Sequence, residues 1–317
     1  MTGPRGTTPR ATRERGTLGQ AFGTIGGDRY SRRVTVTTTA FRIDRERSVI
    51  ERLFRAGLRW APRNVAFAVT RTLAAHPRRA PNSPAEAAAA LVARRSRAGA
   101  GGRLPVLTWG EGPTVVLVHG WGGRATQMAP LALHLAAAGF RAVAFDVTGH
   151  GDSLARGTGW AAFVRDIAEL AAAAAPLHAL VGHSAGGLTM MAARQLRGVR
   201  ARRYVCINAP HHPYPPLVQI RRRIDPGADV IERYRGFLAG QFLTDWASLE
   251  AGCAWEGAGS DLLLCYDRDD RYIDPGDAGR IHARCPGSTL ALTRGFGHAG
   301  VLAADEVAAT AARFLRT

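Results

Sequence analysis

A serine set among small residues is the first feature that could do chemistry. The stretch "GHSAGG" (182–187) places Ser184 between Gly182 and Gly186, after an apolar run and before a helix-like one. A tight strand-to-helix turn needs neighbours without bulk, and it leaves the hydroxyl projecting over the sheet. The pattern G-x-S-x-G in this setting predicts a nucleophile elbow with Ser184 as the nucleophile.

A serine hydroxyl needs a neighbouring base to become a nucleophile at neutral pH. Among the ten histidines, His298 lies in the glycine-rich stretch "GFGHAG" (295–300), after the last strand-like run. His183 is next to Ser184 on a strand, so strand alternation predicts that its ring points to the opposite face. The chain order serine, acid, histidine of such sites favours His298 as the base.

The acid that orients the base should come from the stretch "YDRDDRYID" (266–274). The strand-like run before it, "YVCINAP", ends without a carboxylate, and the next acid along the chain lies far from any strand end. The stretch offers four candidates, and the residues alone leave the choice between them open: Asp267, Asp269, Asp270 and Asp274.

Strand-like and helix-like runs alternate from residue 105 onward. Continuous apolar strands between helices predict an α/β fold with a mostly parallel, doubly wound sheet that is buried on both faces. Every candidate group follows the carboxyl end of a strand, where such sheets place their sites. The expected strands are 105–109, 114–120, 141–147, 178–183, 202–209, 261–267 and 288–293, and the expected helices are 126–138, 158–175, 186–197 and 303–315.

The positive charge is concentrated in the first third of the chain. Residues 1–100 hold 20 Arg against 6 Asp and Glu, a net +14, whereas residues 101–317 hold 22 against 19, a net +3. We expect a flexible Arg-rich arm (1–47), a helical extension and linker (48–100) and the main domain (101–317). The extension shows helical spacing over 48–75, restarted at Pro62, and a short helix over 85–97. One face of the 48–75 stretch could lie on a membrane, but a soluble body follows directly, which favours docking onto the main domain.

That charge could attract nucleic acid or an anionic membrane surface. No nucleic-acid-binding motif supports a specific nucleic-acid role, and a peripheral membrane contact of the basic N-terminus stays open. "SRRVTV" (31–36) is similar to a twin-arginine signal but lacks the apolar stretch that export needs. No run approaches the roughly 20 apolar residues of a membrane span. We therefore expect a cytoplasmic protein.

Cysteine usage gives no sign of a metal or a disulfide framework. The four cysteines are widely spaced and show no metal-ligand pattern. We expect neither a metal nor an organic cofactor.

Five motifs together resemble the α/β-hydrolase family over residues 105–317. In order they are "HGWGG" (119–123), "DVTGHGDS" (146–153), "GHSAGG" (182–187), "YDRDDRYI" (266–273) and "GFGHAGVL" (295–302). The match is to serine hydrolases such as esterases, lipases and cofactor-free haloperoxidases. A serine at the elbow distinguishes the chain from dehalogenases and epoxide hydrolases of this fold, which carry aspartate there.

The resemblance also implies roles for further residues. The backbone N–H groups of Trp121 and Ala185 would form the oxyanion hole. In related hydrolases the acid lies a few residues past its strand and precedes a short "R-x-hydrophobic" stretch, which favours Asp270 before "RYI". Asp269 and Asp267 stay as the alternatives.

An insertion over about 210–258 is expected to form a small helical cap. Its large apolar residues could line an acyl pocket or only pack the cap: Phe237, Phe242, Leu243 and Trp246. The predicted activity is hydrolysis of a small or medium carboxylic ester, thioester or amide through an acyl-enzyme on Ser184. The alternatives are an acyltransferase on the same scaffold and a non-catalytic ligand-binding homologue.

Overall fold

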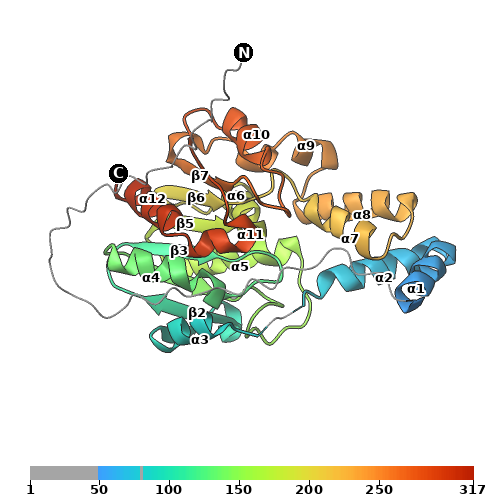
Figure 1. Cartoon of the computed structure of the whole chain (residues 1–317), viewed down its shortest axis with the longest axis horizontal. Helices are drawn as coiled ribbons and strands as arrows, with labels where there is room; N and C mark the ends of the chain where they lie inside the picture. The colour runs from blue at the N-terminus through green and yellow to red at the C-terminus, as the bar shows by residue number, and fades with distance from the viewer. Residues whose placement is uncertain (1–48, 79–80) are drawn as a thin grey trace, which may run out of the picture. The chain divides into compact units, whose positions relative to one another are not determined.

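A computed structural model describes residues 49–78 and 81–317 (Figure 1). The arm expected over 1–47 and the stretch 31–36 lie outside these residues. The described chain begins with α1 (Val49–Trp60) and α2 (Arg63–Ala75), which are separated at Pro62 as the sequence predicts. None of the described helices is long and apolar enough to cross a bilayer.

Eight strands form one sheet in the order β1-β2-β4-β3-β5-β6-β7-β8. The six strands from β4 to β8 in this order pair in parallel. The strands β1 and β2 add an antiparallel edge next to β4. This confirms the predicted mostly parallel α/β sheet. The strands are β1 (Arg94–Ala98), β2 (Leu104–Trp109), β3 (Thr114–Val118), β4 (Arg141–Phe145), β5 (Leu177–His183), β6 (Arg203–Ile207), β7 (Leu262–Asp267) and β8 (Thr289–Thr293).

Helices cover both faces of this sheet. Alternate residues of each strand point to opposite faces, so Val116 and Val118 join one buried core and Val115 and Leu117 join the other. The first core includes residues of α5, α6 and α10, and the second includes residues of α3, α4 and α12. These helices are α3 (Pro84–Leu91), α4 (Ala129–Ala137), α5 (Trp160–Ala173), α6 (Ala185–Arg197), α10 (Asp277–Arg284) and α12 (Asp305–Arg316).

The short helix expected over 85–97 is wrong in its second half. A capping box between Ser83 and Glu86 starts α3, but the helix ends at Leu91 and the chain continues as β1. Arg95 of β1 lies opposite Leu107 of β2 in the antiparallel pair. Exposed arginines suit an edge strand, because charge on an edge opposes pairing with other chains.

The insertion between β6 and β7 is helical, as expected for the cap. It contains α7 (Pro215–Arg223), α8 (Ala228–Gln241) and α9 (Trp246–Glu250). The helix α2 contacts both α7 and α8 (Figure 1). One such contact is between the rings of Phe67 and Phe237, whose centroids are 6.1 Å apart.

Candidate active site

Ser184 occupies the turn between β5 and α6 with a strained backbone. Its φ of 54° and ψ of −124° are unusual for a residue with a side chain. Its neighbours have no room for bulk: a Cβ on Gly182 would lie 2.6 Å from the carbonyl carbon of Gly186, and a Cβ on Gly186 would lie 2.4 Å from the carbonyl oxygen of Val118. The Ser184 N–H donates to the carbonyl of Ile207 at 2.9 Å. The turn therefore has the geometry that the G-x-S-x-G spacing predicts.

His298 and Asp270 are brought together from different loops. His298 lies in the short helix α11 (Gly297–Gly300) after β8, and its Nδ1 is 2.7 Å from Oδ2 of Asp270. The other oxygen of Asp270 accepts from the N–H groups of Tyr272 at 2.7 Å and Ile273 at 3.0 Å. Because a carboxylate faces Nδ1, that nitrogen carries the proton and Nε2 is left as the acceptor.

The three other aspartates of the stretch 266–274 do not contact the imidazole. Asp274 accepts from the N–H of Gly276 and from Arg280, both at 2.9 Å, and the other two contact the backbone near His298. Asp267 is fully buried and accepts from the N–H groups of Phe296 at 3.2 Å and Gly297 at 3.0 Å. Burial favours the neutral acid, but these hydrogen bonds outweigh it and lower the pKa of Asp267. Asp269 accepts from the N–H of Gly295 at 2.9 Å. Both carboxylates therefore hold the chain that leads to His298.

His183, whose ring is expected on the face opposite Ser184, contacts the chain at His298. Its Nε2 is 2.8 Å from the carbonyl oxygen of His298, and the two ring centroids are 4.7 Å apart. Burial lowers the pKa of His183 to about 3. The ring is therefore neutral near pH 7, with its proton on Nε2, which donates to the carbonyl.

Asn208 is a further residue of the site that the sequence analysis did not identify. It follows β6, is fully buried and has a φ of 44°. Its amide nitrogen donates to the carbonyls of Gly297 at 3.3 Å and His298 at 3.4 Å, and its amide oxygen accepts from the N–H of Asp267 at 2.9 Å. The available signal was an asparagine directly after a buried strand, a type that tolerates this left-handed conformation.

The segment after β3 lies against the serine turn. A Cβ on Gly120 would be 2.9 Å from the Cβ of Ser184. His119 fixes this segment, because its Nδ1 is 2.8 Å from the carbonyl of Gly120 and its Nε2 accepts from the N–H of Val147 at 3.2 Å. Burial lowers the pKa of His119, which keeps this ring neutral.

The N–H groups of Trp121 and Ala185 follow Gly120 and Ser184 in the chain. Within residues 49–78 and 81–317, neither donates a hydrogen bond to a protein acceptor. The indole of Trp121 stacks on the rings of Phe163, 5.8 Å away, and Trp160, 5.7 Å away. The role of these two N–H groups in an oxyanion hole stays a prediction.

In the described part of the chain no hydrogen bond joins the Ser184 hydroxyl to His298. The His183 ring, in the residue before the serine, lies 4.7 Å from the His298 ring between centroids. Hydrogen bonds between catalytic groups are often long in the absence of substrate and tighten when it binds.

The four apolar residues expected in the cap lie in different surroundings. Phe237 packs against Phe67 of α2, and the buried Phe242 packs against Trp160 with ring centroids 5.5 Å apart. Leu243 is exposed with a φ of 56°. Trp246 packs edge-to-face against the ring of His212, with ring centroids 5.5 Å apart. Of the four, Phe242 is the one that connects to the site, through Trp160 and its stacking partner Trp121.

Comparison with solved structures shows the same fold at low sequence identity. The thioesterase domain from the curacin biosynthetic pathway is 17% identical with a TM-score of 0.53, and the match covers 71% of this chain and 99% of that one. A thermophilic esterase from Thermogutta terrifontis is 18% identical with a TM-score of 0.51, covering 71% and 98%. The epoxide hydrolase VrEH1 from Vigna radiata is 19% identical with a TM-score of 0.52, also covering 71% and 98%.

Comparison of the sequence with family models identifies the family of this chain. No curated protein matches the chain with significance. The family model described as "Alpha/beta hydrolase family" matches residues 115–310, which is more than half of the chain and includes the serine turn, the aspartate loop and His298. With the strand order described above, this match shows that the chain belongs to the alpha/beta hydrolase family.

Proposed function

We propose that this chain is a serine hydrolase that cleaves a carboxylic ester or thioester through an acyl-enzyme on Ser184. The observation that carries the proposal is the hydrogen bond of 2.7 Å between Asp270 and His298, beside a serine with a φ of 54° at a strand-to-helix turn. A serine, a base and an orienting acid are the parts that nucleophilic acyl transfer requires.

Each residue has a defined step in this mechanism. His298 takes the hydroxyl proton on Nε2 as Ser184 Oγ attacks the acyl carbonyl. The N–H groups of Trp121 and Ala185 stabilise the oxyanion, each by roughly 3–4 kcal/mol. The intermediate collapses as His298 returns the proton to the leaving alcohol or thiol. Water, deprotonated by the same histidine, then releases the acid.

Asp270 holds the imidazole in the tautomer that this sequence of steps needs. Its two backbone hydrogen bonds fix the carboxylate, so that it faces Nδ1 of His298 and stabilises the imidazolium that forms. Because Asp270 is almost fully buried, its charge acts on the ring with little screening by water.

Family membership and the serine at position 184 together favour hydrolysis of an acyl substrate. Membership of the alpha/beta hydrolase family supports a hydrolase, and two structural neighbours are named as a thioesterase domain and an esterase. A third is an epoxide hydrolase, and enzymes of that type resemble this chain but carry aspartate at the elbow. Ser184 favours acyl chemistry over epoxide opening.

The proposal predicts that Ser184→Ala abolishes ester hydrolysis. The hydroxyl is the only group removed, and alanine also has a Cβ at the same φ, so the melting temperature should stay nearly unchanged. We would label both proteins with a fluorophosphonate probe and measure turnover of p-nitrophenyl esters of increasing acyl length. The wild type should take up the label and the variant should not.

Ser248→Ala is the matched control, because this serine lies on α9 and bonds to Asp245. It should keep both labelling and turnover. Turnover above a few percent in Ser184→Ala would contradict the assignment of the nucleophile. A wild type that neither labels nor turns over any ester would favour a non-catalytic ligand-binding protein, and ester products formed with added alcohols would favour an acyltransferase.

A further inference from the structure

The helix α1 contacts the rest of the domain through two arginines and one leucine. Arg55 forms an ion pair with Asp225 at 3.1 Å and donates to the carbonyl of Arg222 at 2.9 Å. Arg59 lies 3.7 Å from the same aspartate. Leu58 is the one buried side chain of this helix. A surface helix of a globular domain normally turns its apolar face to the core, whereas the other large apolar side chains of α1 are exposed.

The opposite face of α1 is apolar and open to solvent. At 100° per residue its large apolar side chains fall on one side of the helix. Their exposed fractions are 60% for Val49, 78% for Ile50, 67% for Leu53, 45% for Phe54 and 90% for Trp60. We call these five residues the α1 apolar face. Adjacent apolar residues exposed in this way mark an interaction surface rather than ordinary surface variation.

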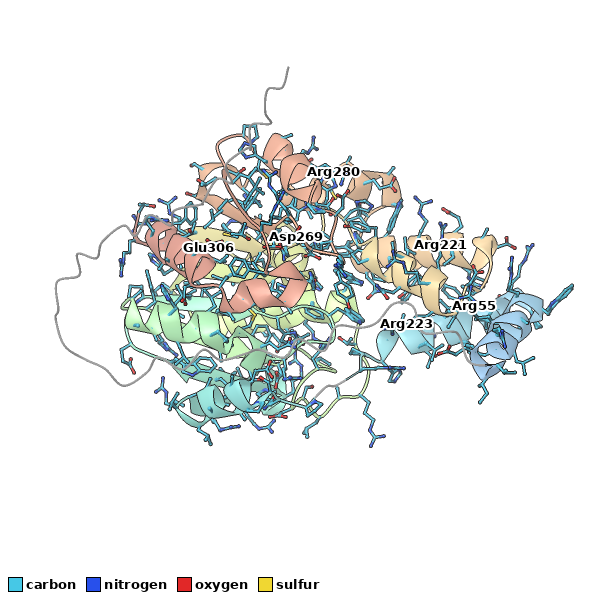
Figure 2. The ribbon with its side chains drawn as sticks, in the orientation of Figure 1. Arg55, Arg221, Arg223, Asp269, Arg280 and Glu306 are labelled. Atoms are coloured by element: carbon cyan, nitrogen blue, oxygen red, sulfur yellow. The ribbon has the colours of Figure 1, made fainter. Side chains whose placement is uncertain are left out.

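Arginines lie on the polar face of α1 and at its junction with α7. Arg52, Arg59 and Arg63 are exposed on α1 and at the start of α2, and Arg221 to Arg223 are exposed at the end of α7. Figure 2 shows the labelled Arg55, Arg221 and Arg223 gathered where α7 meets α1 and α2. Tryptophan, phenylalanine and leucine on one face of a helix whose polar face carries arginine are typical of helices that lie in a membrane interface.

We propose that the α1 apolar face docks this protein on a bilayer rich in anionic phospholipid. The apolar side chains would enter the acyl boundary, and the exposed arginines would meet the headgroup phosphates.

Charge complementarity favours an anionic bilayer over a second copy of the chain or residues 1–48 as the partner of the α1 apolar face. A second copy docked face to face would bring two arginine clusters together, which like charges oppose. Residues 1–48 carry 10 Arg against 4 Asp and Glu, a net +6, so that segment is repelled as well.

The test is binding of the full-length protein to vesicles of phosphatidylcholine alone or with phosphatidylglycerol, measured by flotation. We expect binding only to the vesicles with phosphatidylglycerol, and release at high salt. The double variant Ile50→Gln with Leu53→Gln should lower the vesicle partition coefficient by about tenfold or more. Both side chains are exposed, so folding should not be affected, and an unchanged melting temperature would verify this.

The matched control changes two equally exposed apolar residues elsewhere. Leu91 and Val92 are 81% and 69% exposed, and arginines follow them in the chain. Leu91→Gln with Val92→Gln should bind like the wild type. Tryptophan emission should also shift to the blue on binding, and Trp60→Phe should remove most of that shift.

Three results would overturn the proposal. The first is a wild type that binds neither vesicle. The second is an Ile50→Gln, Leu53→Gln variant that binds as well as the wild type, because binding would then come from charge elsewhere in the chain. The third is a wild type that elutes as a dimer while this variant elutes as a monomer, because a second copy would then cover the face. None of these results depends on the proposed hydrolase activity.

Discussion

At the scale of single residues, two aspartates three positions apart support His298 in different ways. Asp270 contacts the imidazole, and Asp267 contacts the backbone of the chain that carries it. Substitution of each aspartate by asparagine therefore separates the effect on catalysis from the effect on stability. Substitution of Asp270 should mainly lower kcat, and substitution of Asp267 should mainly lower the free energy of unfolding.

We predict that Asp270→Asn lowers kcat by about 10³–10⁴, the order found for this change in a serine protease. The amide oxygen can keep the hydrogen bonds from Tyr272 and Ile273, so the melting temperature should change little. The amide nitrogen would face Nδ1 and favour the wrong tautomer of His298. Stopped-flow kinetics with the best p-nitrophenyl ester and a thermal melt would measure both effects.

Asp267→Asn is the control, with the reverse outcome. Its amide nitrogen would meet N–H donors, so the free energy of unfolding should fall by about 1–3 kcal/mol, while kcat at low temperature should fall far less than in Asp270→Asn. A larger loss of kcat in Asp267→Asn would make Asp270 the wrong choice of acid.

Single residues with a local signature could be predicted, and residues that act through distant backbone could not. The spacing around Ser184 and the loop position of His298 follow from short-range pattern, and the stretch "RYI" pointed to Asp270 through the family resemblance. His183 and Asn208 have no such signature. Their roles depend on where the His298 carbonyl lies, which the fold decides and the neighbouring sequence does not.

At the scale of elements, Asn208 ties together the ends of three neighbouring strands. It follows β6, accepts from the last residue of β7, and donates to the chain after β8. These strands pair in parallel, and Asn208 adds side-chain hydrogen bonds between their carboxyl ends.

We predict that Asn208→Gly lowers kcat by about tenfold while KM stays within about threefold. Glycine accepts the φ of 44° without strain, so the change removes only the side-chain hydrogen bonds. The loop of His298 should then sample more positions and populate the reactive one less. The melting temperature should also fall, because buried backbone groups lose partners.

Esterase kinetics and thermal melts of Asn208→Gly and Asn208→Ala would test this. Alanine adds backbone strain at the same φ, so it should be less stable than the glycine variant. A wild-type kcat in the glycine variant would show that the loop of His298 does not need the Asn208 hydrogen bonds for catalysis.

Element types were predictable where the hydrophobic period was clear, and element ends were less so. The buried strands β3 to β7 are continuous apolar runs, and the sequence predicted all of them. The strand β1 has the sequence "RRSRA" and follows an alanine-rich helix, so local propensity extended the helix through it. Pairing with β2 is a long-range interaction that overrides this propensity.

At the scale of the whole molecule, buried neutral histidines make the fold sensitive to acid. Burial is the main cause of a lowered pKa at His119, His183, His211 and His212. A lowered folded-state pKa means that the unfolded chain binds more protons below pH 6.5. Stability contributed by such a group is complete above about pH 6.5 and is lost as the pH falls toward the folded-state pKa, which for His183 is about 3.

We therefore predict that the free energy of unfolding falls steadily between pH 6.5 and pH 4.5. Over this window His183 alone should contribute a loss of about 2 kcal/mol, because each pH unit between its two pKa values is worth about 1.4 kcal/mol. Urea unfolding at four pH values would give the slope. The aspartates with lowered pKa, such as Asp267, act mainly below this window. The lowered pKa of Glu169 and Glu250 adds to the slope only at its lower end.

Two substitutions assign the slope to a residue. His183→Gln keeps a donor for the His298 carbonyl but cannot bind a proton, so it should lower stability at pH 7 and make the slope shallower by about the contribution of one histidine. His76→Gln is the control, because this ring is exposed, and its slope should match the wild type. An unchanged slope in His183→Gln would mean that protonation of this ring does not drive acid unfolding, and the loss would then belong to the remaining buried histidines.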